Sequence, residues 1–315
     1  MRSFSSFAHD DEVRLTRVQT TAPSSDTQTY TLDALGNRIA HSRVSGAWTY
    51  DANNRLTQRG SGAGATSYLY DNAGNLTQKL EAGATTTYRY DIQNRLIEVA
   101  LAQSVGIEQV IARYGYDPQD RRIWKEQYAS KTGEPLFMAQ RTLYLYSDKG
   151  LLAEATQTFS AADASIITAP TITTQYGLRP DSPWGTAPLF IQIKNSAGQT
   201  SMAYYHHDQL GTPLQATDKA GNIVWAASFD AFGRASITTP QATADKPTIT
   251  SNLRLPGQYE DLETGLHYNF RRYYDPEIGR YVTADPIGLE GVLISMLMRE
   301  GTRYHELIPW ASPIF

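Results

Sequence analysis

Tyrosine recurs at a fixed interval of 20 residues in the N-terminal third of the chain, at Tyr30, Tyr50, Tyr70 and Tyr90. An aspartate follows directly in three of these copies, which gives the pairs Tyr50-Asp51, Tyr70-Asp71 and Tyr90-Asp91. Tyr116-Asp117 repeats the pair after a longer gap. A fixed period of this kind is the signature of a repeat architecture, in which each unit packs mainly against its neighbours. The chain is therefore expected to fold as stacked copies of one small unit.

Residues 85–100 predict what one unit looks like. Side chains alternate in character from Thr86 to Tyr90, which is the period of a β-strand. Asp91 then opens a turn, because its carboxylate can accept hydrogen bonds from backbone N–H groups two residues on. Asn94 tolerates the left-handed conformation that closes such a turn, and Leu96 begins the return strand. One repeat is thus a β-hairpin of about 20 residues, and the fixed interval favours stacked hairpins over an ordinary tyrosine-rich β-sandwich.

Composition agrees with β structure and excludes several function classes. The 315 residues include 20 Tyr, 23 Gly and 15 Pro, types that favour pleated surfaces and turns. The formal net charge is −4 without a basic block, which argues against nucleic-acid binding. The absence of cysteine excludes disulfides, thiol catalysis and cysteine-ligated metals. Residues 1–13 lack the apolar stretch of a secretory signal, and the longest apolar run, Val292–Met298, is too short to span a bilayer.

Two segments in the C-terminal half carry a resemblance to a known family. They read HHDQLGTPLQATDKAGNIVWAASFDAFGR at 206–234 and GQYEDLETGLHYNFRRYYDPEIGRYVTADPIGL at 257–289. Together with the tyrosine–aspartate pairs, they resemble the YD-repeat family of Rhs (rearrangement hotspot) proteins, the first its conserved segment and the second its repeat-associated core. The chain is also similar to the C components of bacterial ABC toxin complexes and to teneurin YD shells. The resemblance covers residues 25–290.

The resemblance implies an all-β fold, in which YD-repeat hairpins wind into a spiral sheet that forms a segment of a barrel or cocoon shell. In this family the core region closes one end of the shell. A variable toxin domain follows the core and is held inside in an unfolded state. An aspartic-peptidase-like site in the core cleaves between shell and toxin. Encapsulation is therefore the function class that the resemblance implies.

On this basis the chain divides into six segments. They are an N-terminal lead-in at 1–24, YD repeats at 25–155, an irregular β segment at 156–202, the Rhs conserved segment at 203–252, the Rhs repeat-associated core at 253–289 and a short divergent tail at 290–315. The tail is interpreted as a truncated toxin junction, because it is too short for a toxin domain that folds by itself. Within the irregular segment, short strands are expected at Ala164–Thr168 and Leu189–Lys194.

Asp285 is the first candidate for a catalytic role, because it opens an Asp-Pro-x-Gly motif that resembles the family's cleavage signature. The remaining motif residues are Pro286, Gly288 and Leu289. The family carries a second copy of the motif downstream, where residues 307–310 of this chain read Leu-Ile-Pro-Trp. Aspartic proteolysis needs two carboxylates that share one proton, and Asp275 is a candidate partner. The missing copy favours a simple Asp-Pro turn, so the chain is expected not to be an enzyme, or at most an autoproteolytic aspartic peptidase.

Two further clusters have structural explanations. His206, His207 and Asp208 are adjacent, but neighbouring residues on a strand point to opposite faces, which favours a polar sheet edge over a metal site. No metal and no cofactor are expected. Arginines interleave with tyrosines between residues 268 and 280, which allows either nucleic-acid binding or cation–π and Asp–Arg pairing within a sheet. The acidic net charge favours the pairing.

Three function classes follow from these observations. The leading one is a structural shell or encapsulation segment of a bacterial Rhs-type polymorphic toxin used in bacterial competition, without a toxin domain of its own. The alternatives are a self-cleaving aspartic-peptidase core that releases a C-terminal toxin, and a cell-surface carbohydrate- or protein-binding module. Expected partners are a C-terminal toxin or the upstream shell region of a larger Rhs protein, and an export-machine adaptor. We expect synthesis in the bacterial cytoplasm and export or surface display through a dedicated secretion system.

Overall fold

The computed structural model describes residues 5–21, 25–103, 107–240 and 248–286, and most of these residues lie in β-strands. The only helical element among them is a short 3₁₀ turn at Gly62–Gly64. No helix in these ranges has the length and apolar character needed to cross a membrane. The all-β prediction is confirmed. Contacts divide the chain into two compact units, the first formed by residues 1–88 and 101–108 and the second by 89–100 and 109–315.

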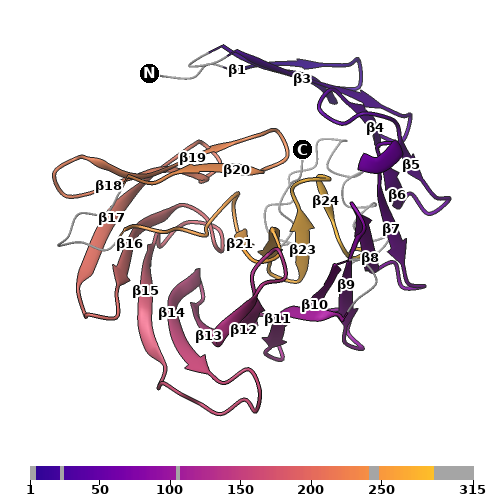
Figure 1. Cartoon of the computed structure of the whole chain (residues 1–315). Coiled ribbons are helices and arrows are strands. Elements are labelled where there is room, and N and C mark those ends of the chain that lie inside the picture. Colours follow the sequence, from indigo (N-terminus) through magenta and orange to yellow (C-terminus); the bar gives the residue numbers. More distant parts are fainter. Residues whose placement is uncertain (1–4, 22–24, 104–106, 241–247, 287–315) are drawn as a thin grey trace. The chain divides into compact units, whose positions relative to one another are not determined.

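The first unit contains two sets of antiparallel strands (Figure 1). One sheet has the order β1 (Ser5–His9), β2 (Leu15–Thr20), β3 (Asp26–Leu32), β4 (Arg38–His41). The second set begins the large sheet with β5 (Trp48–Tyr50), β6 (Leu56–Arg59), β7 (Thr66–Tyr70) and β8 (Leu76–Glu81). Two further strands contribute residues to both units, β9 (Ala84–Tyr90) and β10 (Leu96–Gln103).

The second unit continues the large sheet in chain order. Its strands are β11 (Gln109–Tyr116), β12 (Arg122–Ala129), β13 (Pro135–Ser147), β14 (Gly150–Phe159), β15 (Thr171–Leu178), β16 (Pro188–Lys194), β17 (Thr200–His207), β18 (Pro213–Thr217), β19 (Ile223–Phe229) and β20 (Ala235–Thr238). Consecutive strands from β11 to β20 pair antiparallel. The hydrogen-bonded order of the described strands begins at β5 and ends at β20, so the large sheet is open and not closed into a barrel.

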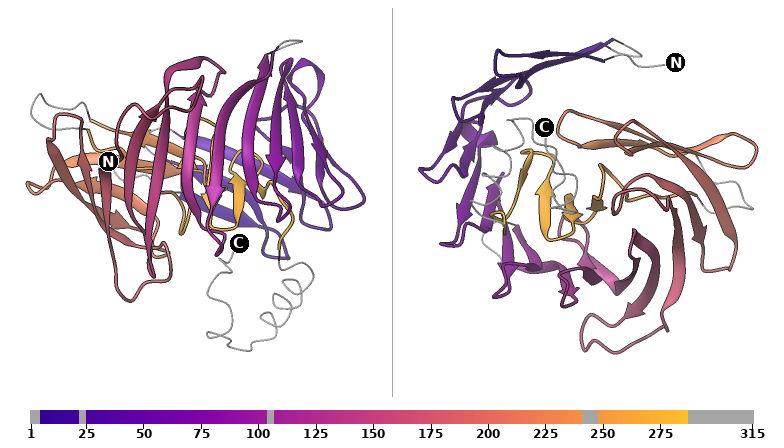
Figure 2. Two further views of the ribbon diagram at one scale, coloured as in Figure 1. Left: turned by 90° about the horizontal axis from the view of Figure 1, so that it is seen from below. Right: turned by 180° about the vertical axis from the view of Figure 1, so that it is seen from behind.

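A third, small sheet belongs to the second unit. It has the order β21 (Tyr259–Asp261), β22 (Leu266–Asn269), β23 (Arg272–Asp275), β24 (Arg280–Tyr281). In Figures 1 and 2 this sheet, drawn in yellow, lies against one face of β11–β14. Ring contacts bridge the two layers, with centroids 5.2 Å apart for Tyr114 and Tyr273 and 5.5 Å apart for Tyr144 and Tyr259. Tyrosine rings therefore line the interface between the small sheet and the large one.

The tyrosine–aspartate repeats form the predicted hairpins. In β7–β8, Tyr70 pairs with Leu76 while Leu69 pairs with Gln78, so Thr77 is an extra residue in the ladder. Residues that pair across a ladder point to the same side, so Leu76 shares the face of Tyr70. The same one-residue shift occurs directly before the repeat tyrosine in β5–β6 and β11–β12. The left-handed residues that close two of the turns are Asn54 (φ 63°) and Asn94 (φ 60°), as expected.

The tyrosines that stand two residues before Tyr70, Tyr90, Tyr116 and Tyr146 are deeply buried. Their exposed fractions are 2% for Tyr68, 6% for Tyr88, 2% for Tyr114 and 5% for Tyr144. Because residues two apart on a strand share a face, each repeat places two aromatic rings on one side, and the earlier one lies deeper. The first residue after the turn completes this core, with Leu56, Leu76 and Leu96 only 0–2% exposed.

The segment 156–202 is more regular than expected. The strand expected at Leu189–Lys194 is confirmed as β16. The strand expected at Ala164–Thr168 is wrong, since only Ile166 forms an isolated bridge, with Phe159. The reason lies in the backbone hydrogen bonds, because the N–H groups of Ile167 and Thr168 both donate to the Thr158 carbonyl, at 3.0 and 3.1 Å. Two donors on one acceptor close a turn and do not continue a ladder.

Candidate functional site

The aspartate of each repeat holds its own turn together. Asp91 Oδ1 accepts hydrogen bonds from the backbone N–H groups of Gln93 (2.9 Å) and Arg95 (3.0 Å), and Oδ2 accepts one from Arg95 Nε (2.8 Å). Partial burial raises the pKa of Asp91, but these hydrogen bonds lower it by more, so the pKa lies below its ordinary value. The same contacts recur in the pairs Asp51–Arg55 and Asp117–Arg121.

Tyr50, Tyr70 and Tyr116 join their repeats to the ones before, whereas the Tyr30 hydroxyl donates to Gln28 Oε1 in its own strand at 3.0 Å. The Tyr116 hydroxyl donates to the backbone carbonyl of Leu96 at 2.5 Å, and the guanidinium of Arg95 lies 5.0 Å from the centroid of the Tyr116 ring. Since Arg95 also binds its own turn aspartate, one arginine connects two consecutive repeats. The hydroxyl contact recurs in the pairs Tyr50–Arg38, Tyr70–Leu56 and Tyr146–Arg122. The predicted repeat residues therefore make the contacts that stack one hairpin on the next.

Arg122 departs from the pattern of the three repeats before it. It follows its turn aspartate by five residues, the position that leucine occupies at Leu56, Leu76 and Leu96. Arg38 has this position in the first repeat. The side chain of Arg122 is nevertheless 0% exposed, so a full charge replaces a core leucine. Burying a charge is costly unless an opposite charge and hydrogen bonds accompany it.

The opposite charges come from the small sheet β21–β24 and its first turn, which we call the C-terminal sheet. Arg122 Nη1 donates to Asp261 Oδ2 at 2.5 Å, and Lys125 Nζ donates to Asp261 Oδ1 and Glu263 Oε2, both at 3.1 Å. Burial raises the pKa of Asp261, but the charges of Arg122 and Lys125 lower it by more, and the net direction is downward. All four side chains are at most 9% exposed. We call Arg122, Lys125, Asp261 and Glu263 the buried charge cluster.

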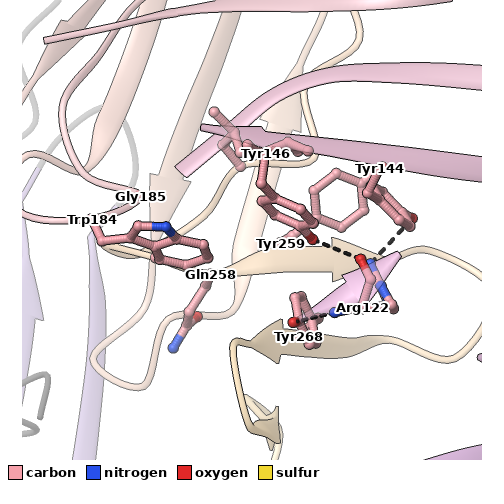
Figure 3. A pocket seen from close by; sticks show the side chains of 11 residues that line it. Arg122, Tyr144, Tyr146, Trp184, Gly185, Gln258, Tyr259 and Tyr268 are labelled. Atoms are coloured by element: carbon pink, nitrogen blue, oxygen red, sulfur yellow. Dashed lines mark hydrogen bonds between the residues drawn. The ribbon is translucent and has the colours of Figure 1, made fainter. Parts of the chain in front are cut away.

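Tyrosine rings surround the guanidinium of Arg122 (Figure 3). Its distances to the ring centroids are 4.5 Å for Tyr268, 4.6 Å for Tyr144, 5.3 Å for Tyr259, 5.5 Å for Tyr114 and 5.8 Å for Tyr273. The hydroxyls of Tyr144 and Tyr273 each accept a hydrogen bond from Arg122 at 3.1 Å. Burial raises the pKa of Tyr144 to about 12, so the ring is neutral at pH 7. Aromatic faces with neutral hydroxyls favour the charged form of the arginine.

Glu154 provides a second polar link between the two sheets. Its Oε1 accepts a hydrogen bond from the Tyr176 hydroxyl (2.6 Å) and its Oε2 accepts one from the Tyr259 hydroxyl (2.8 Å). Burial raises the pKa of Glu154, and the two tyrosine hydrogen bonds oppose this rise without reversing it. Strands β14, β15 and β21 therefore meet at one carboxylate.

A small cavity lies beside the buried charge cluster. It is lined by Arg122 and by the rings of Tyr146, Trp184 and Tyr259, among others (Figure 3). Its volume is ≈ 30 Å³, which suits a single water-sized molecule. A sugar ring or a peptide side chain does not fit this space, so this cavity does not support the carbohydrate-binding alternative.

The two candidate catalytic aspartates have structural partners. Asp285 Oδ2 lies 2.9 Å from Arg272 Nη1, and the guanidinium of Arg272 stacks on Tyr281 at 3.7 Å. Asp275 opens a turn, in which its backbone carbonyl accepts a hydrogen bond from Gly279 N–H at 2.8 Å. Catalysis by Asp285 or Asp275 stays a prediction. Pro286 is described, whereas Gly288, Leu289, the run Val292–Met298 and the tail 290–315 lie outside the described residues.

The histidine pair of β17 also has local partners. His206 Nε2 lies 2.9 Å from Thr217 Oγ1, and His207 Nε2 contacts the Pro188 carbonyl. No group of three histidine or carboxylate side chains within the described ranges has the spacing of a metal site. These contacts place both histidines in the cross-strand hydrogen bonding of the large sheet.

The buried charge cluster was not predicted from the sequence. One signal for it exists, because Arg122 interrupts a position that carries leucine in three preceding repeats. The acidic residues that complete it are harder to find, since Tyr-Glu-Asp-Leu-Glu at 259–263 also fits a solvent-exposed turn. Only the folded contact, which spans 139 residues, identifies Asp261 as the partner of Arg122.

Comparison with known proteins adds three findings. The family model described as Teneurin YD-shell matches residues 2–293. Double-stranded DNA deaminase toxin A of Burkholderia cenocepacia is 33% identical over 202 residues, which cover 63% of this chain and 14% of that protein. Toxin protein Tse5 of Pseudomonas aeruginosa is 42% identical over 104 residues, which cover 33% of this chain and 7% of Tse5. The chain therefore spans a small part of the length of these curated relatives.

Among solved structures, the crystal structure of TcdB2-TccC3 aligns with a TM-score of 0.48 at 16% sequence identity. The alignment covers 91% of this chain and 18% of that one.

Proposed function

Because the chain belongs to the teneurin YD-shell family, we propose that it is a wall segment of a bacterial Rhs-type polymorphic toxin and that it encloses toxin polypeptide. The large sheet is the wall in this proposal, and β21–β24 is its closing piece. The observation that carries the proposal is the buried charge cluster, which joins the C-terminal sheet to wall strand β12. A side-chain cluster at 0–9% exposure suits a permanent structural joint and not a substrate-binding site.

The repeat contacts support the same role. Each hairpin is tied to the previous one by a tyrosine hydroxyl and, at Arg95, by an arginine that stacks on the next tyrosine. Such contacts stabilise an extended surface. The partners in this proposal are a toxin polypeptide and further shell regions of a longer protein. Export or display through a secretion system, for use in bacterial competition, is part of the proposal.

Protease protection of an attached polypeptide tests the containment function. An unfolded reporter peptide with several trypsin sites is fused after Phe315 and compared with the same peptide free in solution. If the wall encloses it, the fused reporter is cut at least about tenfold more slowly than the free one, because local access of the protease limits cleavage.

The matched control is a variant in which the joint is broken, Arg122→Ala with Asp261→Ala. Loss of protection in this variant supports containment by a wall that the C-terminal sheet closes. Equal cleavage of the free reporter, the wild-type fusion and the variant fusion contradicts the proposed function.

A further inference from the structure

The C-terminal sheet contacts the wall through side chains and not through strand pairing. Among the described residues its four strands pair only with one another in ladders, and none is a strand neighbour of the large sheet. Its contacts with β12 and β14 come mainly from side chains, including those of Asp261 and Tyr259. Side-chain contacts of this kind can discriminate between partner sequences, whereas strand pairing is largely sequence-independent.

One face of β21 carries these contacts. Alternate residues of a strand point to the same side, so Tyr259 and Asp261 both face the wall. Glu263, in the turn that follows β21, also reaches the wall through Lys125. The wall partners of these three residues are Glu154, Arg122 and Lys125. The residues between them do not face it, since Leu262 is 54% exposed and Glu260 forms an ion pair within the C-terminal segment, with Arg254. The three named residues of the pattern Tyr-x-Asp-x-Glu therefore supply the side chains of this segment that contact Glu154, Arg122 and Lys125.

The wall supplies two cations at this place, and the carboxylates that form ion pairs with them come from the C-terminal sheet, including the turn after β21. Among the described residues, the ion pairs of Arg122 and Lys125 are all with Asp261 and Glu263. Of the neighbouring wall carboxylates, Glu126 pairs with Arg141, and Glu154 accepts hydrogen bonds from Tyr176 of the wall and from Tyr259 of the C-terminal sheet. A neutral hairpin seated on β12 would leave two buried charges without counter-charges, which is strongly unfavourable.

We propose that Arg122 and Lys125 form a charge-selecting recognition site, whose partner is an acidic, tyrosine-bearing β-hairpin with the pattern Tyr-x-Asp-x-Glu. The inference rests on the proposed wall function and adds what the wall selects. In this chain the partner is the segment 248–286. The carboxylate of Asp261 bridges both cations, and Glu263 provides the second charge for Lys125. A wall with this site accepts a closing piece that carries both carboxylates and rejects one that lacks them.

The test uses the full chain with a cleavable connection. Residues 241–247 are replaced by a recognition sequence for a site-specific protease, and the purified protein is cut there. Retention of the C-terminal fragment on the rest of the chain is then measured by gel filtration over a dilution series, which gives an apparent dissociation constant. We compare the wild type with Lys125→Met, Glu263→Met and the double variant.

Lys125→Met is expected to weaken retention by about 100-fold or more, because Glu263 is then buried without a cation. Glu263→Met is expected to weaken it by at least about tenfold, because Lys125 then keeps only Asp261 as its partner. The double variant is expected to recover at least about tenfold of the loss in Lys125→Met, since an apolar pair leaves no charge without a partner. Asp285→Asn is the matched control, because it removes a carboxylate from the same segment away from the cluster, and retention within about fivefold of wild type is expected.

Equal retention in all variants, or a double variant no better than the worse single variant, overturns the proposal. If a single variant fails to fold before cutting, circular dichroism of the uncut double variant tests the proposal instead. A folded double variant supports charge selection, and an unfolded one contradicts it. The result is separable from the containment test, because fragment retention is measured without any enclosed polypeptide.

Discussion

Arg122 and Asp261, separated by 139 positions in the chain, form an ion pair with 2.5 Å between Nη1 and Oδ2 and with both side chains at 0% exposure. Arg122 stands where three preceding repeats have leucine, so one hairpin of the wall differs from its neighbours in its core. The difference is matched by a carboxylate from another sheet. The repeat pattern is thus interrupted at the place where the C-terminal sheet attaches.

The hydroxyl of the repeat tyrosine contributes to stability through its hydrogen bond to the preceding repeat. Tyr116→Phe removes the donor to the Leu96 carbonyl, together with a longer contact of 3.4 Å to the Tyr273 hydroxyl, and is expected to lower the free energy of unfolding by about 1 kcal/mol. Urea denaturation measures the change. Tyr204→Phe, at a site 39% exposed, serves as the control with an expected change within about 0.5 kcal/mol. Equal effects of the two substitutions would mean that the hydroxyl link between repeats contributes nothing.

The turn aspartate makes stability depend on pH. Asp91→Ala is expected to cost about 1–2 kcal/mol at pH 7, because three hydrogen bonds to the carboxylate are lost. Since the folded pKa of Asp91 lies below its ordinary value of 3.8, its contribution is complete above pH 3.8 and is lost as the pH falls below that value. The difference between wild type and variant in urea denaturation should therefore shrink at pH 3. A difference that stays constant from pH 7 to pH 3 argues against the ionised turn. Asp148→Ala, at a side chain 83% exposed, is the control.

Gly115 is required by the ring of Trp124 on the neighbouring strand. A Cβ atom at Gly115 would lie 2.1 Å from the Trp124 indole, so either the ring or the strand must move. Gly115→Ala is expected to cost about 2 kcal/mol or more, as overpacking in a filled site does. Thermal unfolding followed by circular dichroism reports the loss. Gly64→Ala is the control, since a Cβ atom added there would meet nothing within 4 Å. Similar melting temperatures for the two variants would contradict the assigned packing.

His267, in the C-terminal sheet, is a second source of pH-dependent stability in this chain. Burial lowers the pKa of His267 to about 3, and the nearby Arg254 adds to this shift. The unfolded chain takes up the proton near pH 6.5, so the stability that the neutral ring provides is complete above pH 6.5 and falls between pH 6.5 and pH 3. Urea denaturation at pH 7, 6, 5 and 4 should show a steeper decline for the wild type than for His267→Gln. His206→Gln, at an exposed site, should keep the wild-type slope. Identical slopes for the wild type and His267→Gln would exclude a buried neutral histidine.

The repeat hairpins could be predicted because their information is local. Asp91 and Asn94 specify the turn through their own backbone contacts, and the 20-residue interval specifies that hairpins stack. Period-two alternation also predicts that tyrosines two residues apart, such as Tyr68 and Tyr70, lie on the same face of the strand. The deeper burial of Tyr68 than of Tyr70 could not be read from the repeat, because burial depends on the tertiary packing around each ring.

The buried charge cluster could not be predicted for a different reason. Its two halves lie in separate sheets, and no local rule distinguishes Asp261 from a solvent-exposed turn aspartate. The role of Asp285 could not be predicted from the sequence either. Its motif favours a turn over catalysis, and its ion pair with Arg272 becomes visible only in the fold. Tertiary contacts assign roles to charged residues in ways that spacing alone does not.

A double-mutant cycle on Arg122 and Asp261 tests most directly whether their ion pair holds the C-terminal sheet to the wall. The free energies of unfolding of the wild type, Arg122→Met, Asp261→Leu and the double variant are measured by urea denaturation. Each single substitution should cost about 3–5 kcal/mol, and the double substitution should cost at least about 2 kcal/mol less than their sum. Strictly additive losses would contradict the account, because they would mean that the two charges do not stabilise each other.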